Sequence, residues 1–370
     1  MDVFLILIGL TGFIVSAVMC TVSFFKNKAR IKFWYIVLVS AFVVLIIGGA
    51  IAGPSSETSK DNKPTETKTA IQSSTPDKKV SSPVTNVALK VHFIDVGQAD
   101  SILIQSPSGK SILIDGGDNE DGPFVVKYIK AQGINKLDAV VATHPYEDHI
   151  GGLDNVIKNF PVTSFYMPNV TSTEKTYSDL IKAVESNSNA KLQVKSGVIL
   201  DLPGLTAKFL APNSSSYKDM HNYSAVLKLT YGDTSFLLTG DAENVSEAEM
   251  LKAGYNLKAT LLKVSQHGSN DSTTSAFLKA VSPEYAVISV GKGNSYGLPA
   301  QQILDRLSSA GVKIYRTDEV GTIIATSDGK SITIDKKASS IKPHAPSASS
   351  VKTKTAITEN NSVADFLDER

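Results

Sequence analysis

The sequence predicts an α+β protein in which two mixed β-sheets pack together with helices on their outer faces, after two membrane-spanning segments. Three observations support this prediction. The middle of the chain begins with hairpins and then alternates strands with helices, two long uncharged stretches precede it, and polar low-complexity segments flank it. The 370 residues suffice for one large domain with additions, or for two domains.

Composition is that of an ordinary folded protein, with 42% hydrophobic and 20% charged residues. The formal net charge of +1 makes no overall electrostatic case for nucleic-acid binding, so any such case depends on a local patch. A single cysteine, Cys20, excludes an intrachain disulfide framework and a cysteine-rich zinc site.

Two uncharged stretches, residues 3–25 and 33–53, are each long enough to cross a bilayer core of about 30 Å as a helix. The connection between them carries four positive charges, and none precedes the first stretch. The positive-inside tendency therefore places the connection in the cytoplasm and both termini outside. A cleaved signal peptide fits less well, because no basic segment precedes the apolar run and the run is too long. Residues 1–53 are predicted to anchor the chain in the cell membrane.

Residues 54–88 are rich in Ser, Thr, Pro and Lys and contain few apolar residues. Such a stretch cannot bury enough surface to offset the entropy of ordering, so it is predicted to be a flexible linker. Residues 337–370 form a low-complexity tail of the same character. The folded unit is therefore expected at residues 89–336, outside the cytoplasm.

The folded unit opens with strand-like runs at residues 89–94, 101–104 and 111–115, and the turn residues 106–110 predict a hairpin. A second hairpin is expected to join 223–231 to 234–239 across Gly232 and Asp233. Apolar spacing predicts helices at 123–132, 151–159, 173–187, 243–253, 272–280 and 299–310. Further strands are predicted at 259–264, 285–290, 313–316, 322–326 and 331–334.

The segment from Thr143 to Gly152 follows an apolar run at 137–142 that reads as a buried strand. It contains His144, Asp148 and His149, and imidazole and carboxylate groups suit zinc, manganese or iron. A solvated turn would also explain such a cluster. The segment alone therefore indicates a metal site without establishing it.

Three other predicted strands also end in a ligand-type side chain beside glycine. They end at Asp115, Asp241 and His267, which adjoin Gly116, Gly240 and Gly268 respectively. Each of them alone is more readily explained as a polar strand end than as a functional residue. Because functional residues collect on loops at strand ends, four such elements in one domain predict a shared cleft.

These elements resemble the metallo-β-lactamase fold, and within it the extracytoplasmic hydrolase domain of ComEC-type DNA-uptake proteins. The resemblance covers residues 89–334 and rests on six ordered motifs: FIDVGQAD at 93–100, IDGG at 114–117, the His–Asp–His segment, LTGD at 238–241, HGS at 267–269 and YGLP at 296–299. It implies a four-layer αβ/βα sandwich with metal at one edge and hydrolysis by a metal-activated water. The channel domain of the uptake proteins is absent from the matched region, which suggests a tethered relative.

The sequence departs from the superfamily pattern His-x-His-x-Asp-His, because Tyr146 stands at the second histidine position. This weakens the first of two metal sites and leaves His144, a bridging Asp241 and a residue near position 221. His221 is one candidate, and an Asn-x-Ser pattern at Asn222 and Ser224 is the other. Two further departures are Gln266 and Leu298, at positions where histidine is frequent.

The second metal site is complete, with the ligands Asp148, His149, Asp241 and His267. Its donor set fits a divalent zinc or manganese ion. The resemblance assigns Asp148 to orienting the attacking water, and His144 to the first site or to a general-acid role. Asp95, Asp115 and Tyr146 are expected to support the ligands, although Asp95 and Asp115 could equally stabilise turns.

Substrate contacts are predicted at Lys263, Ser269, Lys292, Asn294 and Tyr296. A glycine-rich loop with lysine can cradle phosphate, and Tyr296 can stack on a base. An ordinary polar turn is the competing explanation for this loop.

Three functions are consistent with these features. The first is a metal-dependent phosphodiesterase that acts on DNA outside the membrane. The second is a hydrolase of another class, for lactams, esters or lipid phosphates, because one fold hosts many reactions. The third is a surface binding domain without catalysis, to which Tyr146, Gln266 and Leu298 would point.

Overall fold

A computed structural model describes residues 88–187 and 190–340 of the chain. The predicted spans at 3–25 and 33–53, almost all of the linker at 54–88, and the tail from residue 341 lie outside the described residues. Within the described part, no helix has both the length and the apolar character needed to cross a membrane.

Eight strands form the first sheet, and their order confirms the predicted hairpin between β2 and β3. The strands are antiparallel from β14 to β3 and parallel from β3 to β6. In spatial order they are β14 (Ile332–Ile334), β13 (Ile323–Ser327), β1 (Leu89–Phe93), β2 (Ile102–Gln105), β3 (Ser111–Ile114), β4 (Leu137–Val141), β5 (Val162–Pro168) and β6 (Ala190–Val194).

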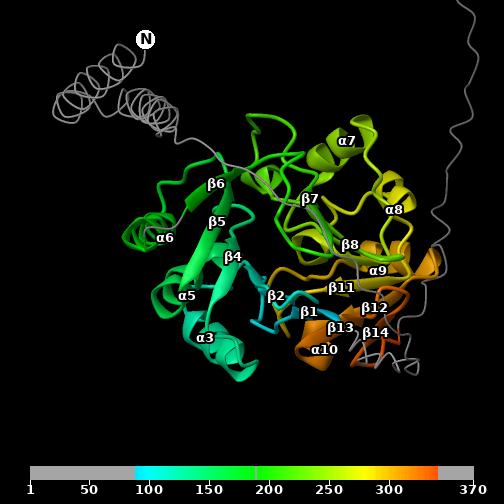
Figure 1. The fold of residues 1–370 in the computed structure, drawn as a ribbon. Coiled ribbons are helices and arrows are strands. Elements are labelled where there is room, and N and C mark those ends of the chain that lie inside the picture. Colours follow the sequence, from blue (N-terminus) through cyan, green and yellow to red (C-terminus); the bar gives the residue numbers. More distant parts are fainter. Residues whose placement is uncertain (1–87, 188–189, 341–370) are drawn as a thin grey trace, which may run out of the picture. The chain divides into compact units, whose positions relative to one another are not determined.

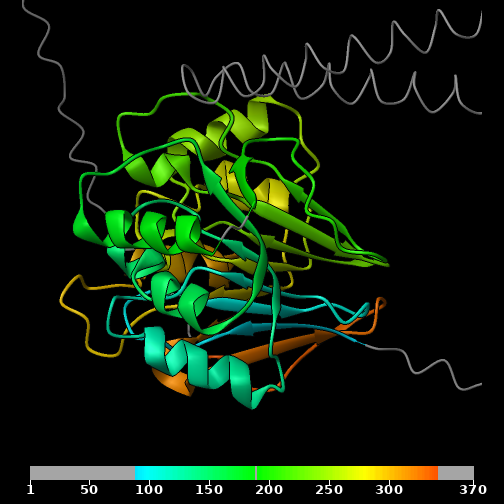
Figure 2. The same ribbon diagram turned by 60° about the vertical axis from the view of Figure 1, so that its left-hand side comes forward.

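Six strands form the second sheet, which is also mixed. The predicted hairpin between β8 and β9 is antiparallel, and the sheet is parallel from β9 to β12. In spatial order the strands are β12 (Lys313–Arg316), β11 (Tyr285–Ile288), β10 (Leu261–Lys263), β9 (Thr234–Leu238), β8 (Leu227–Tyr231) and β7 (Thr206–Phe209). Figure 2 shows the green strands of this sheet as a layer separate from the blue and orange strands of the first.

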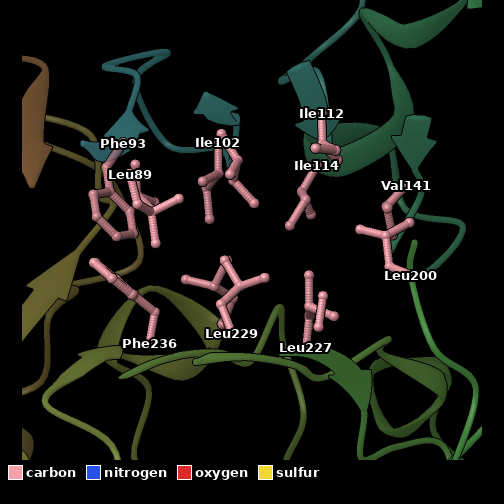
Figure 3. Packing of buried hydrophobic residues seen from close by; sticks show 14 of the residues in the cluster. Leu89, Phe93, Ile102, Ile112, Ile114, Val141, Leu200, Leu227, Leu229 and Phe236 are labelled. Carbon is pink, nitrogen blue, oxygen red and sulfur yellow. The ribbon is translucent and has the colours of Figure 1, made fainter. Parts of the chain in front are cut away.

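The central core lies between the two sheets. Alternate residues of β1, such as Leu89 and Phe93, point inward and meet Leu229 and Phe236 from the second sheet (Figure 3). Because side chains alternate along a strand, the intervening His92 points to the other face, where its ring contacts Tyr128. Burial of these large apolar side chains is the main force that holds the sheets together.

Helices cover both outer faces, so the predicted four-layer arrangement is confirmed for the described residues (Figure 1). Over the first sheet lie α3 (Gly122–Ala131), α5 (Leu153–Asn159) and α6 (Lys175–Ser186). Over the second sheet lie α7 (Asn244–Lys252), α8 (Ser275–Val281) and α9 (Gln301–Ser309). Short turns complete the unit: α4 (Glu147–Ile150), α10 (Thr317–Val320), η2 (Met220–Tyr223) and η3 (Ser265–Gly268).

Two predictions about local structure were wrong. The strand expected from residue 223 begins at Leu227, because Asp219 caps the preceding turn η2 by accepting a hydrogen bond from the His221 amide. The His–Asp–His segment was expected to be a turn before one helix. It instead contains α4, which ends at Ile150 before α5 begins at Leu153.

Candidate metal centre

Four predicted ligands from three distant segments meet at one edge of the sandwich. Asp148 and His149 lie on α4, Asp241 follows β9, and His267 lies in η3 after β10. One ligand atom of each lies within 4.8 Å of the others. The Nε2 atom of His267 is 3.2 Å from Asp148 Oδ2, and the Nε2 atom of His149 is 3.3 Å from Asp241 Oδ2. The strand ends therefore form the shared cleft that the sequence predicts.

Buried polar atoms without partners show that this cluster suits a cation. The Nε2 atoms of His144 and His149 and the Oδ1 atom of Asp241 are buried and make no hydrogen bond. Such atoms are rare in folded proteins, because each one loses its hydration without compensation. Two imidazole nitrogens and two carboxylates at this spacing match the donors that zinc or manganese takes. The residues present fit a divalent metal ion.

The electrostatics of the cluster also favour positive charge at its centre. Burial disfavours the charged ring of His149, but Asp241, Asp148 and Asp115 raise its pKa well above the ordinary value. Burial likewise opposes ionisation of Asp148, yet the His149 and His267 rings lower its pKa to about 2. The site thus holds its carboxylates ionised and draws positive charge to itself.

A second set of ligand atoms shares Asp241. His144, His221 and Asp241 also present ligand atoms within 4.8 Å of one another. The Nε2 atom of His221 is 3.9 Å from Asp241 Oδ2, and its Nδ1 atom is 2.8 Å from Asp219 Oδ1. A carboxylate on one ring nitrogen orients the other toward a metal. Of the two sequence alternatives, the geometry favours His221.

Asn222 and Ser224, the other alternative, have structural contacts instead. The Asn222 amide donates to Glu243 and accepts from the Ser246 amide. The Ser224 hydroxyl accepts a hydrogen bond from the Asp241 amide. Both residues hold the backbone around the cluster.

The sequence left open whether Asp115 and Asp95 support metal ligands or stabilise turns, and the structure assigns one role to each. Asp115 is buried and accepts hydrogen bonds from the His149 ring and from the amide and hydroxyl of Thr143. Asp95 accepts only from the amide of Gly97, in a turn. Asp115 therefore supports a ligand, and Asp95 stabilises a turn. Tyr146 packs edge-on against His144, with ring centroids 5.2 Å apart, and lines the cleft.

A cleft of about 690 Å³ opens over the cluster. The predicted substrate residues Ser269 and Tyr296 line it, and the Tyr296 side chain is 75% exposed. Asn294 instead uses its amide to close its own loop, through the backbone of Gly291, Tyr296 and Leu298. Lys292 is exposed but is not among the residues that line the cleft.

The prediction that Lys263 binds substrate is wrong. Its side chain is fully buried, and its Nζ atom lies 2.9 Å from Asp100 Oδ2. The lysine is the last residue of β10, a strand whose three residues are all buried.

Sequence reasoning missed three acidic residues at the centre. Asp100 lies beside His267, whereas Asp118 and Glu147 line the cleft. Burial, and then the negative charges of Asp148, Asp121 and Glu147, raise the pKa of Asp118 to about 6. For Asp118 the available signal was the one used for Asp115, since Asp118 also lies in the loop after β3 and adjoins Gly117. Asp100 and Glu147 have no such signal, because neither residue adjoins a glycine.

Comparison with known proteins agrees with this arrangement. A family model described as the metallo-beta-lactamase superfamily matches residues 94–292. This region is more than half of the chain, which therefore belongs to that superfamily.

The relatives include two competence proteins. ComE operon protein 3 of Bacillus subtilis (strain 168) is 33% identical over 251 residues, covering 63% of this chain and 32% of that protein. Competence protein ComA of Neisseria gonorrhoeae is 31% identical over 231 residues, covering 62% and 31%. Both are ComEC-like competence proteins, and the match spans about a third of their length. The solved metallo-beta-lactamase fold protein YhfI from Bacillus subtilis matches 63% of this chain and 98% of its own, at 14% identity and a TM-score of 0.41.

Proposed function

We propose that residues 89–336 form a metal-dependent phosphodiesterase that hydrolyses DNA. The observation that carries this proposal is the pair of ligand sets that share the buried Asp241. Two metal ions held a few ångströms apart by a shared carboxylate are the usual arrangement for phosphoryl hydrolysis. The choice of DNA is supported by the competence proteins among the relatives.

Bound metal ions would lower the pKa of water and polarise the phosphoryl oxygen. Within its ligand set Asp148 alone keeps substantial exposure, with 34% of its side chain accessible. Its carboxylate therefore accepts a hydrogen bond from the attacking water and orients it.

Proton donation to the leaving oxygen fits Asp118 better than His144. Burial and the neighbouring His149 ring lower the pKa of His144 well below the ordinary value, so His144 is neutral and serves as a ligand. Asp118 lines the cleft, and its pKa of about 6 lets its carboxyl hold a proton in mildly acidic solution.

The cleft itself favours a single strand over a duplex. Among the described residues that line it there is no lysine or arginine, so the cleft offers little to a rigid double helix that needs many phosphate contacts. Tyr296 offers one exposed ring on which an unpaired base can stack. We therefore expect cleavage of single-stranded DNA to exceed cleavage of duplex DNA.

The test is hydrolysis of end-labelled single-stranded and duplex DNA by the purified chain, with manganese, with zinc and with chelator. Asp148→Ala and His267→Ala should each reduce the rate by at least about 100-fold, the scale of a lost catalytic group. Glu185→Gln, on the exposed face of α6, is the matched control and should keep full activity. Metal binding without phosphodiester cleavage would identify a binding domain, and cleavage of lactams or esters instead would identify another hydrolase class.

We further propose that the spans at 3–25 and 33–53 hold the enzyme at the cell membrane, with the folded unit outside the cytoplasm. This rests on the charge asymmetry around the spans. Protease added to intact cells should then cut the linker at 54–88. Cleavage only after permeabilisation would reverse the orientation.

A further inference from the structure

A fully buried ion pair lies directly beneath the metal centre. Lys263 Nζ is 2.9 Å from Asp100 Oδ2 and donates a hydrogen bond to the Val264 carbonyl at 3.1 Å. Both side chains have almost no contact with solvent. A buried pair of this kind is often no more stabilising than apolar residues of the same volume. Stability alone therefore does not explain its presence.

Asp100 is attached through its backbone to the part of the centre that comes from the first sheet. Its amide donates to the carbonyl of Asp148 at 3.0 Å, and its carbonyl accepts from the amide of Gly117 at 2.9 Å. The next residue, Ser101, donates its hydroxyl to the carbonyl of Asp115. Movement of Asp100 would consequently move the segments that carry Asp148 and the partner of His149.

Lys263 is attached to the part of the metal centre that comes from the second sheet. It ends β10, and η3 with His267 follows after one residue. The Nδ1 atom of His267 donates a hydrogen bond to the Ser289 carbonyl at 2.9 Å. Asp100 Oδ1, which makes no hydrogen bond of its own, lies 3.6 Å from the same Nδ1 atom. The carboxylate thus contacts both Lys263 and a ligand histidine.

We propose that the Lys263–Asp100 pair is the positioning element that sets the spacing between the Asp148 and His267 sides of the metal centre. The backbone of Asp100 fixes one side and its carboxylate holds the other through Lys263. A pair buried away from water keeps its geometry, because neither partner can exchange to solvent at low cost. This inference rests on the metal centre of the proposed function but not on the identity of the substrate.

The experiment measures metal affinity of the full chain by calorimetry with Mn²⁺, and ligand geometry from the visible absorption of bound Co²⁺. Lys263→Met keeps the length of the side chain and removes its charge, and Asp100→Asn keeps shape and backbone contacts. Each should weaken Mn²⁺ binding by about 10- to 100-fold, the range for residues that orient ligands. Each should also change the Co²⁺ spectrum.

The double variant Lys263→Met/Asp100→Asn separates positioning from stability. It leaves no unpaired buried charge, so it should fold even where Lys263→Met alone does not. The double variant should recover thermal stability. Its Mn²⁺ affinity should stay as low as that of the single variant that binds Mn²⁺ more weakly, because both substitutions remove the same Lys263–Asp100 interaction. Recovery of affinity together with stability would show that the pair only fills the core.

Arg316→Met is the matched control. It removes a mostly buried pair, in which Arg316 Nη2 lies 2.6 Å from Asp318 Oδ2 at the end of β12. It should lower the unfolding temperature and leave Mn²⁺ affinity and the Co²⁺ spectrum unchanged. If Lys263→Met and Asp100→Asn behave like this control, the proposal is wrong. If both single variants lose Mn²⁺ affinity and change the Co²⁺ spectrum but the unchanged protein does not cleave DNA, the inference stands and only the proposed substrate is wrong.

Discussion

Each histidine of the centre has one ring nitrogen engaged, which directs the other toward the cluster. The Nδ1 atom contacts a carboxylate, a backbone carbonyl or a hydroxyl, and Nε2 is left to face the ligands. The Nδ1 partners are Thr143 for His144, Asp115 for His149, Asp219 for His221 and Ser289 for His267. Such partners fix the tautomer and raise ligand basicity. Metal affinity at this centre therefore depends on residues that never touch the metal.

Asp115→Asn tests this dependence. The variant keeps the volume of the side chain, and asparagine tolerates the positive φ of 57° at this position. It removes the carboxylate from the His149 ring, so Mn²⁺ or Zn²⁺ affinity should fall by about 10- to 100-fold in calorimetry. Asp95→Asn is the control and should bind metal normally, because Asp95 only closes a turn. Equal affinity of both variants and the unchanged protein would contradict the role assigned to Asp115.

At the scale of elements, the centre depends on close backbone approach between the loop after β3 and the start of α5. A Cβ atom at Gly152 would lie 2.2 Å from the carbonyl oxygen of Gly116, and one at Gly151 would lie 2.2 Å from the amide of Asn119. The Gly116 amide also donates to the carbonyl of His149 at 2.7 Å. Gly151 and Gly152, the last two residues of the His–Asp–His segment, thus let the loop that carries Asp115 pack against this segment.

Gly152→Ala should therefore disturb both stability and metal binding. The added methyl group meets backbone that cannot rotate away, so we expect a loss of about 1–3 kcal/mol in the free energy of unfolding. Because the displaced loop carries Asp115, Mn²⁺ affinity should fall as well. In Gly109→Ala the new Cβ meets open space, but φ of +83° costs about 1 kcal/mol. Denaturant unfolding and calorimetry should show that this control loses stability without losing metal affinity.

At the scale of the whole molecule, the metal centre joins the two sheets. Asp148 and His149 follow β4 of the first sheet, Asp241 and His267 follow β9 and β10 of the second, and Asp241 is common to both ligand sets. A ligand that binds only the folded state stabilises it in proportion to the logarithm of its concentration. Metal should therefore stabilise the sandwich as a unit.

We expect Mn²⁺ at about 100 times its dissociation constant to add about 2.7 kcal/mol, or roughly 5–10 °C in unfolding temperature. Chelator should reverse the shift. Asp241→Ala should abolish it, because both ligand sets lose a member, whereas Glu185→Gln should retain it. Scanning calorimetry with and without Mn²⁺ measures the shift in the unchanged protein, in Asp241→Ala and in Glu185→Gln. A full shift in Asp241→Ala would place the stabilising metal elsewhere.

Much of the site was predictable because its signals are local. Apolar strands that end in Asp115, Asp241 and His267 beside glycine are visible in the sequence, as is the His–Asp–His segment. The contacts of Lys263 were not predictable, since a lysine after two leucines can face either the cleft or the interior. Its partner Asp100 lies 163 positions earlier in the chain, and only the packing of the sheets brings them together.

The sequence by itself determined the order of strands and helices, the two mixed sheets and the ligand chemistry, because alternation and strand-end residues are properties of short segments. Only the tertiary structure decided that His221, and not Asn222 or Ser224, groups its ligand atom with those of His144 and Asp241. It also decided that Asp115 and not Asp95 supports a ligand, and that Lys263 is buried. These outcomes depend on which side chains meet across the two sheets. That choice is made by packing of the whole core, which no short segment encodes.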